Sequence, residues 1–452
     1  MGELVIYRLH SIEIFGFWEN AKVHSNFNKD INIFIGKNGT GKTTFIRILQ
    51  SVLTANISMM TALSFSKVIL KFSSINDDEI FTLKVEKDKK DTCLIKYQFD
   101  GEKIFTIPVV FDDQSIEYYE HIRINILNDL KEVRNRLNQI FNVSWLSVLR
   151  EVNRTRDDDR DYNRRAHRDR SSPLDVKLRE LMVGLTEYQL KIEAKVREIA
   201  DQFQKEVLMI MLFDNNLDKI DISNIIEELS YDKLKKDQKE LINAYKELGI
   251  TNQSAEQRIN NQFDILKKSI KTINEKIDSV KKGKIDGSSA TLTISIEDIV
   301  SLPLYNRTQS IINNSMTAKQ KRADVIFPLT QYLGILQKFS PEKEFKLSSS
   351  GGLNIFKKGK ELQISDLSSG EKQLLIFLTE TLLEEGKPFI FIADEPELSL
   401  HIEWQSMLLP SIKKINENAQ VIVATHAPEI AGRYGKSIIN MEDVVNESIQ
   451  FF

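Results

Sequence analysis

The residues with the clearest chemical potential lie in one glycine-rich stretch near the N-terminus. Residues 36–43 read GKNGTGKT, the pattern Gly, four residues, Gly, Lys and then Ser or Thr. Its glycines let successive backbone N–H groups point at an anion, Lys42 adds a full positive charge, and the Thr43 hydroxyl can bind Mg²⁺. The residues predicted to bind nucleotide phosphates here are Gly36, Asn38, Gly39, Thr40, Gly41, Lys42, Thr43 and Thr44.

The sequence on either side of this loop favours a binding site over a simple glycine-rich turn with a surface lysine. INIFI at 31–35 has the composition of a strand, and TTFIRILQSVL from Thr43 to Leu53 has the apolar spacing of an amphipathic helix. Strand, loop and helix in that order place the loop at a helix N-terminus, whose partial positive charge attracts phosphate. We therefore expect a nucleotide-binding loop.

A pair of acidic residues supplies the second chemical feature. Phe389 to Ile392 form a continuous apolar run, typical of a strand buried on both faces, and Asp394 and Glu395 follow at its C-terminal end. Open α/β sheets bind ligands at that end of their strands. Asp394 is predicted to hold Mg²⁺ together with Thr43, and Glu395 to polarise the attacking water. An acidic pair alone is common at strand ends, so its meaning depends on the loop at 36–43.

Two further segments present hydrogen-bond donors. LSSGE at 367–371 begins an amphipathic helix, where free backbone N–H groups form a second surface for phosphate, although an ordinary helix cap is the simpler interpretation of this string by itself. VIVATHAPE reads as a buried strand that ends at Thr425 and His426. His426 is either a donor to a γ-phosphate or a structural histidine. The predicted catalytic residues are Glu395, His426 and Lys42.

The elements that must position these residues lie in the two ends of the chain. Residues 1–150 include four strand-like runs separated by turn-forming segments, KVILKFS, EIFTLKVE, CLIKYQF and KIFTIPVVF, which predict an antiparallel meander. Residues 341–452 begin with a hairpin-like stretch, EFKLSSSGGLNIFKKGKELQIS. They then alternate helix and strand, which predicts a parallel sheet.

The middle of the chain, residues 151–340, is predicted to be a helical insertion. Apolar residues recur at steps of three and four from Leu174 to Ile210 and again from Ile259 to Val280, as expected for amphipathic helices. The insertion is either a projecting arm that recognises a partner or an insert packed on the body. The arginine- and aspartate-rich stretch at 150–173 has almost no apolar residues and is predicted to be a mobile loop.

Charge and composition limit the class of protein. Lys plus Arg number 62 and Asp plus Glu 65, a net charge of −3, which argues against a protein whose main task is to coat nucleic acid. The single cysteine, Cys93, excludes an internal disulfide and suits a reducing compartment. The sequence has neither a secretion signal nor an apolar stretch of about 20 residues that would span a bilayer. The expected protein is soluble and cytoplasmic, without a membrane partner.

Taken in chain order, GKNGTGKT, LSSGE, IFIADEPE and ATH resemble the motifs of the ABC ATPase superfamily. The wide separation of the first motif from the others, with helical sequence between them, is similar to the SMC and RecF branch. The resemblance implies an α/β fold: an ABC ATPase head, with a mixed sheet around the P-loop and an antiparallel β meander, that carries a helical insertion. It also implies ATP and Mg²⁺ as cofactors and ATP hydrolysis as the activity.

Heads of this family dimerise over ATP, and the signature segment of one head completes the site of the other. The resemblance therefore implies a homodimer or higher homo-oligomer formed through the ATP sites. Carried over to this sequence, Ser368 and Gly370 would bind the γ-phosphate in trans, and His426 would be the switch histidine.

Several positions depart from the family pattern. Ser369 and Glu371 replace a glycine and the glutamine of the LSGGQ signature, which weakens the expectation of a tight trans contact. His401 stands where many relatives have the D-loop aspartate. The segment closest to a Q-loop is VSWLSVLREV at 143–152.

Two features of related ATPase families are not found in this sequence, which narrows the set of families that it resembles. The sequence has no Cys-x-x-Cys motif, so the zinc hook of the coiled-coil double-strand-break repair ATPases is not expected. The short stretch after His426 leaves no room for the TOPRIM nuclease of OLD-family proteins. The chain then looks most like the ATPase subunits of anti-phage systems such as Septu and PARIS, in which a nuclease or toxic effector is a separate protein.

Three functions are therefore open. The first is an ATP-driven sensor and scaffold that controls an effector in trans and responds to a phage-derived trigger. The second is a RecF-like repair or recombination ATPase that binds DNA. The third, a nuclease in its own right, is disfavoured because the sequence has no metal-ligand cluster beyond the ATP site.

Overall fold

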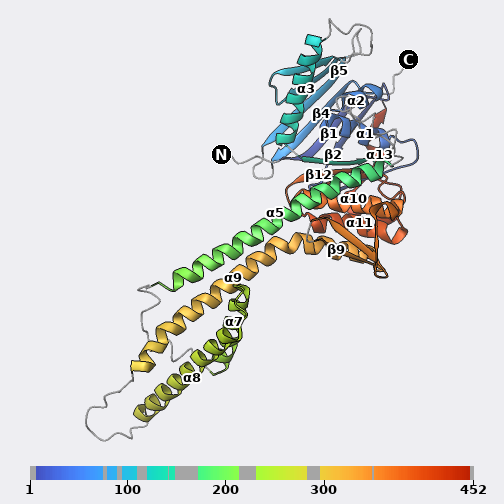
Figure 1. Cartoon of the computed structure of the whole chain (residues 1–452). Helices are drawn as coiled ribbons and strands as arrows, with labels where there is room; N and C mark the ends of the chain where they lie inside the picture. The colour runs from blue at the N-terminus through green and yellow to red at the C-terminus, as the bar shows by residue number, and fades with distance from the viewer. Residues whose placement is uncertain are drawn as a thin grey trace. The chain divides into compact units, whose positions relative to one another are not determined.

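Both ends of the chain build one unit, and the middle builds another (Figure 1). The first unit is Met1–Tyr188 with Leu329–Phe452, and the second is Gln189–Pro328. Nearly all of the predicted mobile loop at 150–173 lies outside the described residues. The structure, a computed structural model, describes residues 7–74, 79–88, 94–108, 120–140, 142–147, 172–212, 231–281, 296–348 and 351–447.

A five-stranded sheet forms the centre of the first unit, and every strand pairing given for it is parallel. Its three middle strands are the apolar runs that the sequence indicated, and their side chains are almost completely buried. The strand order is β14 (Ile438–Asn440), β3 (Ile31–Ile35), β13 (Ala419–Ala424), β12 (Phe389–Asp394) and β8 (Asn142–Ser147). This order brings the carboxyl ends of β3, β12 and β13 to one edge.

A seven-stranded sheet carries the antiparallel part of the head. Its strands alternate buried and more exposed side chains, as expected when one face covers a core. Helix α1 (Lys42–Leu53) and helix α2 (Ile57–Ala62) contribute to that core, and α3 is Glu120–Ile140. The predicted meander is confirmed. The strand order is β15 (Val445–Glu447), β2 (Ala21–Asn26), β1 (Tyr7–Phe17), β4 (Lys67–Ser74), β5 (Ile80–Asp88), β6 (Leu94–Phe99) and β7 (Ile104–Pro108).

The C-terminal part of the first unit begins with a small antiparallel sheet, as the hairpin-like sequence predicted. It consists of β9 (Lys343–Leu347), β10 (Leu353–Lys357) and β11 (Lys360–Leu362). The remaining elements are short turns and helices around the central sheet: η1 (Ile364–Asp366), α10 (Ser369–Leu383), α11 (Ile402–Ile415), α12 (Pro428–Ala431), η2 (Gly435–Ser437) and α13 (Met441–Val444). The α/β head with its separate antiparallel sheet is therefore the fold that the sequence implied.

The second unit is helical and has a hydrophobic core of its own. The two amphipathic helices predicted from apolar spacing are present as α5 (Pro173–Ile210) and α8 (Gln253–Lys281). The described residues of this unit also form α7 (Tyr231–Glu247) and part of α9 (Ile296–Phe339). Helices α5 and α9 run from one unit into the other. None of the helices in the described part of the chain is long and apolar enough to cross a membrane. The core is centred on Phe203, Leu241, Phe263, Leu266, Tyr305 and Ile312.

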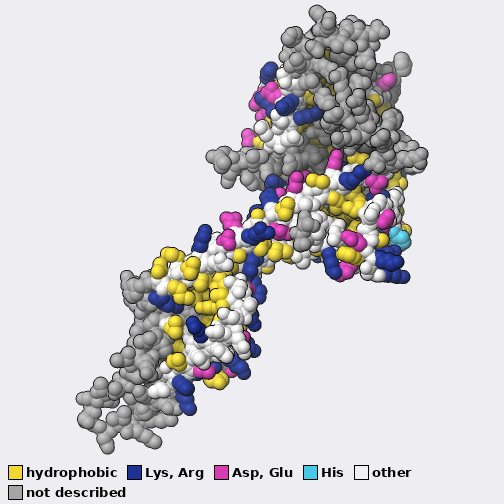
Figure 2. All heavy atoms as spheres, viewed as in Figure 1, with side chains coloured by type: hydrophobic (Ala, Val, Ile, Leu, Met, Phe, Trp, Pro, Cys, Tyr) yellow, Lys and Arg dark blue, Asp and Glu magenta, His cyan; other side chains and the backbone are white. Residues whose placement is uncertain are grey.

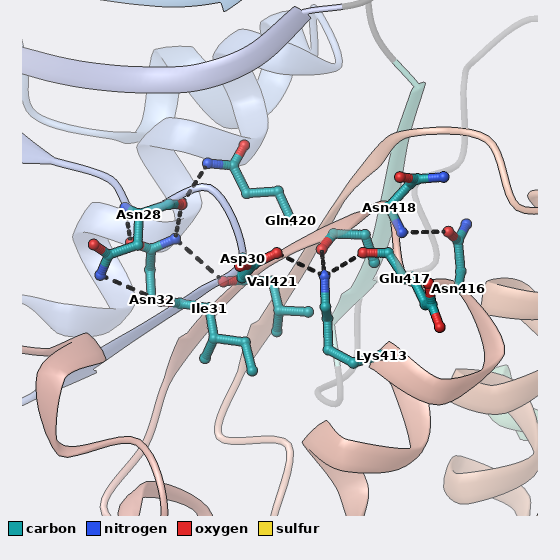
Figure 3. A network of polar contacts seen from close by, with 11 residues as sticks. Asn28, Asp30, Ile31, Asn32, Lys413, Asn416, Glu417, Asn418, Gln420 and Val421 are labelled. Atoms are coloured by element: carbon teal, nitrogen blue, oxygen red, sulfur yellow. Dashed lines mark hydrogen bonds and ion pairs between the residues drawn. The ribbon is translucent and has the colours of Figure 1, made fainter. Parts of the chain in front are cut away.

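Buried amide side chains of the central sheet join the two ends of the chain (Figure 3). Gln420 of β13, which is 1% exposed, accepts a hydrogen bond from Leu9 N and donates to the carbonyl oxygens of Leu9 and Asn28 at 2.8 to 2.9 Å. Asn32 accepts from Asn28 N at 2.6 Å, and Lys413 of α11 donates to Asp30 at 3.0 Å. These bonds tie β13 and α11 to β1 and to the segment that leads into β3.

Replacing Gln420 should destabilise the whole head. The change Gln420→Leu removes the side-chain partner of the buried Leu9 N–H and of the Leu9 carbonyl, whereas the Asn28 carbonyl keeps its bond from Asn32. We expect it to lower the free energy of unfolding by about 2 to 3 kcal/mol. Urea unfolding followed by circular dichroism measures this value. The same change at the exposed Gln253 should alter the free energy by less than about 0.5 kcal/mol. Equal stability of the two variants would contradict the role given to Gln420.

Candidate functional site

The glycine-rich loop joins β3 to α1 in a conformation that few other residues could adopt. Gly41 caps the N-terminus of α1 with a positive φ of 92°, and a Cβ atom there would lie 2.8 Å from the Phe17 ring and 2.9 Å from the Trp18 ring. The loop is therefore packed against the β1–β2 turn and held open on its other side, where a Cβ on Gly39 would meet nothing within 4 Å. Such a cradle at a helix N-terminus fits a phosphate group.

Lys42 lies folded across this loop. Its side chain is 5% exposed, and its Nζ donates hydrogen bonds to the carbonyl oxygens of Gly36 at 2.8 Å and Lys37 at 3.0 Å. Burial lowers the pKa of Lys42, while the nearby carboxylates of Glu395 and Asp394 act in the opposite direction. The Lys42 ammonium group is thus held at the loop by two carbonyl oxygens, and the two nearby carboxylates favour its charged form.

Asp394 lies at the carboxyl end of β12, next to the first turn of α1. Its Oδ1 accepts a hydrogen bond from the Thr43 hydroxyl at 3.3 Å. Burial raises the pKa of the Asp394 carboxyl; the Thr43 bond lowers it, and the Glu395 carboxylate raises it further. Two adjacent hard oxygen donors, one of them a carboxylate, fit Mg²⁺. When bound, Mg²⁺ supplies positive charge toward phosphate oxygens.

The raised pKa predicts that charged Asp394 destabilises the nucleotide-free fold. A carboxyl whose folded pKa exceeds its unfolded pKa contributes stability only at low pH, and this contribution is lost as pH rises through the folded value. The change Asp394→Asn should therefore raise the free energy of unfolding at pH 7 by about 0.5 to 2 kcal/mol, while weakening Mg²⁺-dependent nucleotide binding.

Urea unfolding at pH 7 and at progressively lower pH checks this prediction, because the advantage of Asp394→Asn should shrink as the parent carboxyl becomes protonated. The exposed Asp264 of α8 provides a matched change, Asp264→Asn, which should have little effect. An Asp394→Asn variant less stable than its parent at pH 7 would contradict the electrostatic account.

Glu395 and His426 face each other across the ends of β12 and β13. The two strands are parallel neighbours with Asp394 opposite Ala424, so the residues that follow each strand meet at one edge. Glu395 has a positive φ of 49° and donates its backbone N–H to Ala424 O at 2.8 Å. Its Oε1 lies 3.9 Å from His426 Nε2, and both side chains are partly exposed. A carboxylate and an imidazole so placed can share one water or phosphate oxygen.

The signature segment makes its contacts elsewhere in the head. Ser368 caps α10: its hydroxyl accepts from Glu371 N at 3.3 Å, and its own N–H donates to the Glu371 carboxylate at 2.9 Å. Gly370 packs so tightly on the backbone of Ser399 that a Cβ would lie 2.2 Å from Ser399 O. Within the described residues, neither Ser368 nor Gly370 has a polar contact with the loop at 36–43.

The structure thus brings most of the predicted site residues together and leaves two apart. The loop at 36–44, Asp394, Glu395 and His426 lie at the carboxyl edge of β3, β12 and β13. Asn38 is exposed, and the Thr40 hydroxyl donates to Lys37 O at 2.9 Å within the loop. Ser368 and Gly370 lie at the start of α10, as expected if they serve the site of a second copy.

Other positions were missed or only partly assigned. The aromatic pair Phe17 and Trp18 packs on Gly41, and Trp18 has a positive φ of 51°, a strained conformation that composition does not reveal. Glu397, two residues after Glu395, contacts the loop that carries His426.

His401 caps α11 by accepting from Glu403 N at 3.4 Å. The segment 143–152, proposed as a Q-loop, begins as strand β8, and residues 148–152 lie outside the described part.

Comparisons with known proteins agree with an ATPase. The family described as AAA ATPase domain matches residues 8–431. A retron Ec83 probable ATPase from Escherichia coli is 23% identical over 448 residues, which cover 95% of this chain and 70% of that protein.

Solved SMC heads also align with most of the chain. The Smc head domain with an extended coiled coil from Pyrococcus furiosus, bound to the C-terminal domain of ScpA, aligns at 15% identity and a TM-score of 0.41, over 94% of this chain and 91% of that one. The SMC head domain from Thermotoga maritima aligns at 12% identity and a TM-score of 0.36, over 94% and 91%. By the match to residues 8–431, this chain belongs to the AAA ATPase domain family and is an ATPase.

Proposed function

We propose that this ATPase is the sensor and scaffold subunit of an anti-phage defence complex, and that it controls a nuclease or toxic effector carried by a separate protein. The similarity to a retron ATPase over nearly the whole chain supports a role in defence. Within that class we propose the organisation of the Septu and PARIS systems. The ATPase then forms a homodimer or higher homo-oligomer, binds its effector and responds to a phage-derived trigger.

One observation carries the sensor part of this proposal: the first turn of α10 is ion-paired to both chain segments that lead to the helical unit. Lys372 lies 2.8 Å from Asp175, in the first turn of α5. Its neighbour Glu371 pairs with Lys343, which follows α9 and is 6% exposed. Burial raises the pKa of Glu371, but hydrogen bonds from Lys343 and Ser368 outweigh it and hold the pKa below its usual value.

These ion pairs join the signature segment to the residues that precede and follow the helical unit in the chain. Asp175 belongs to a helix that continues to Ile210, and Lys343 begins the strand that follows α9. Gln337, near the end of α9, also donates to Lys343 O at 2.7 Å. A movement of either helix changes the charge environment of Glu371, which caps the same turn as Ser368. We propose that trigger or effector binding at the helices acts on ATP hydrolysis by this route.

Charge favours this function over a RecF-like DNA-binding ATPase. The net charge is −3, and on the face shown in Figure 2 Lys and Arg side chains are interspersed with Asp and Glu. Sequence-independent DNA binding requires a field of one sign that neutralises phosphates. A nuclease function has less support, because the described residues contain no group of three His, Cys, Asp or Glu side chains that could hold a metal.

Two measurements separate these functions. Cells that carry the chain together with its flanking genes should resist phage, and Lys372→Glu should abolish resistance at an unchanged protein level. Adding Asp175→Lys restores an ion pair of reversed polarity and should return resistance. Resistance that is unaffected by Lys372→Glu would contradict the coupling route. Tight DNA binding by the isolated protein, with a steep dependence on salt, would instead support the repair function.

A further inference from the structure

We propose that Glu397 is a positioning residue for ATP hydrolysis, which sets the place of His426 opposite Glu395. This inference rests on the roles proposed above for Glu395 and His426. Glu397 follows the acidic pair by two residues, on the segment that leaves β12. His426 belongs to the segment that leaves β13. The carboxylate of Glu397 links these two segments by hydrogen bonds.

One oxygen of Glu397 organises the whole turn after β13. Its Oε1 accepts hydrogen bonds from the Thr425 hydroxyl at 2.6 Å, from His426 N at 2.9 Å and from Ala427 N at 3.3 Å. The Thr425 hydroxyl oxygen also accepts from Ala427 N at 2.9 Å. Thr425 is completely buried, so its hydroxyl needs this partner. Successive N–H groups that converge on one anionic oxygen fix the backbone from which the imidazole projects.

The segment that carries Glu397 is itself held in place. Glu395 N donates to Ala424 O at 2.8 Å, and Leu398 N donates to Glu395 O at 3.1 Å. Gln373 of α10, which is 1% exposed, donates to Pro396 O at 3.1 Å. Glu395 and Glu397 therefore lie on one rigid turn. The 3.9 Å separation of Glu395 Oε1 and His426 Nε2 is set from the Glu395 side by this turn and from the His426 side by Glu397.

Glu397 is energetically unfavourable in one respect, which argues that its contacts with the turn after β13 serve the reaction. Its second oxygen, Oε2, is buried and has no hydrogen-bond partner among the described residues. Buried polar atoms without partners are rare, and a catalytic role is one of the explanations for such an atom. A role in placing His426 explains why a carboxylate with an unpartnered, buried oxygen stands at this position.

Steady-state kinetics on the full chain tests the proposal. Glu397→Ala should lower kcat by about 10- to 100-fold, because a shift of about 1 Å at a reacting group has effects of this size. The KM for ATP should stay within about twofold, since the loop at 36–43 is untouched. Glu397→Gln should recover most of the rate, because its amide oxygen can accept the two shorter hydrogen bonds, from the Thr425 hydroxyl and His426 N. The matched change Glu429→Ala, in the first turn of α12, should leave the rate at the parent value.

A double-mutant cycle with His426 tests whether Glu397 acts through that residue. In a His426→Ala background, Glu397→Ala should cause no further loss, because the group that it positions is already absent. Multiplying losses would overturn the proposal. So would equal losses in the Gln and Ala variants, or a loss that falls on KM. If His426→Ala alone keeps the parent rate, the role of His426 fails whatever Glu397 does. Thermal unfolding curves identify any variant that is simply unfolded.

Discussion

Glu395→Gln should lower the rate of ATP hydrolysis by about 10² to 10³ while leaving ATP binding within a few fold, the loss typical when one preorganised catalytic group is removed. The side chain lies at the carboxyl edge of the central sheet, 3.9 Å from His426 and beside the Asp394 that neighbours Thr43. An amide has the same shape as the carboxylate but cannot polarise a water by accepting its proton. Binding should survive because Lys42 and the loop at 36–43 are unchanged.

Single-turnover hydrolysis and equilibrium binding of a fluorescent ATP analogue separate these two effects. The exposed Glu417, beyond the opposite end of β13, provides the matched change Glu417→Gln, which removes one negative charge without touching the site. We expect this control to hydrolyse ATP at the parent rate. Parent-level hydrolysis by Glu395→Gln would show that another residue polarises the water.

Ser368→Asp should abolish hydrolysis with an effect of similar size, about 10²-fold or more, if the signature segment faces the γ-phosphate bound by a second copy. Aspartate is as good an N-cap as serine, so the start of α10 should be preserved. The added negative charge, however, repels phosphate. Ser368 is exposed and has no polar contact with its own phosphate loop in the described structure, so ATP binding by the monomer should not change.

The neighbouring Ser365 supplies a control for the charge alone. Ser365→Asp places the same charge at an exposed position three residues earlier, in the short turn η1 and outside the turn that Ser368 caps. It should reduce hydrolysis by less than about threefold at 0.15 M salt, where exposed charges are screened over about 8 Å. Equal loss in both variants would indicate a general electrostatic effect.

Much of the fold follows from local sequence patterns. The buried strands β3, β12 and β13 are continuous apolar runs, and α5 and α8 repeat apolar residues at helical spacing. Local sequence patterns did not predict strand β8. It pairs with β12, which is distant in the sequence, so the segment VSWLSV was interpreted as part of a Q-loop. Pairing partners of parallel strands are set by the tertiary fold, and a short apolar run does not specify them.

In the candidate site, too, some features can be inferred from contiguous sequence and others depend on the fold. The phosphate loop and the acidic pair are contiguous motifs, so their chemistry can be inferred from residue types in order. Glu397 acts on Thr425 and His426, which come from another strand, and only the fold brings them together. The contacts of Phe17 and Trp18 with Gly41 depend on a strained turn with positive φ at Trp18. Sequence patterns therefore gave the chemistry of single segments, whereas the positioning between segments required the structure.

Mixing two inactive variants tests the trans-completed ATP site most directly. Glu395→Gln and Ser368→Asp are each expected to be inactive alone, but a mixed dimer contains one site with an intact Glu395 from one copy and an intact Ser368 from the other. With random pairing before ATP is added, half of the dimers are mixed and each has one working site, so about a quarter of the parent ATPase rate should return. A mixture that stays as inactive as its two components would contradict the account.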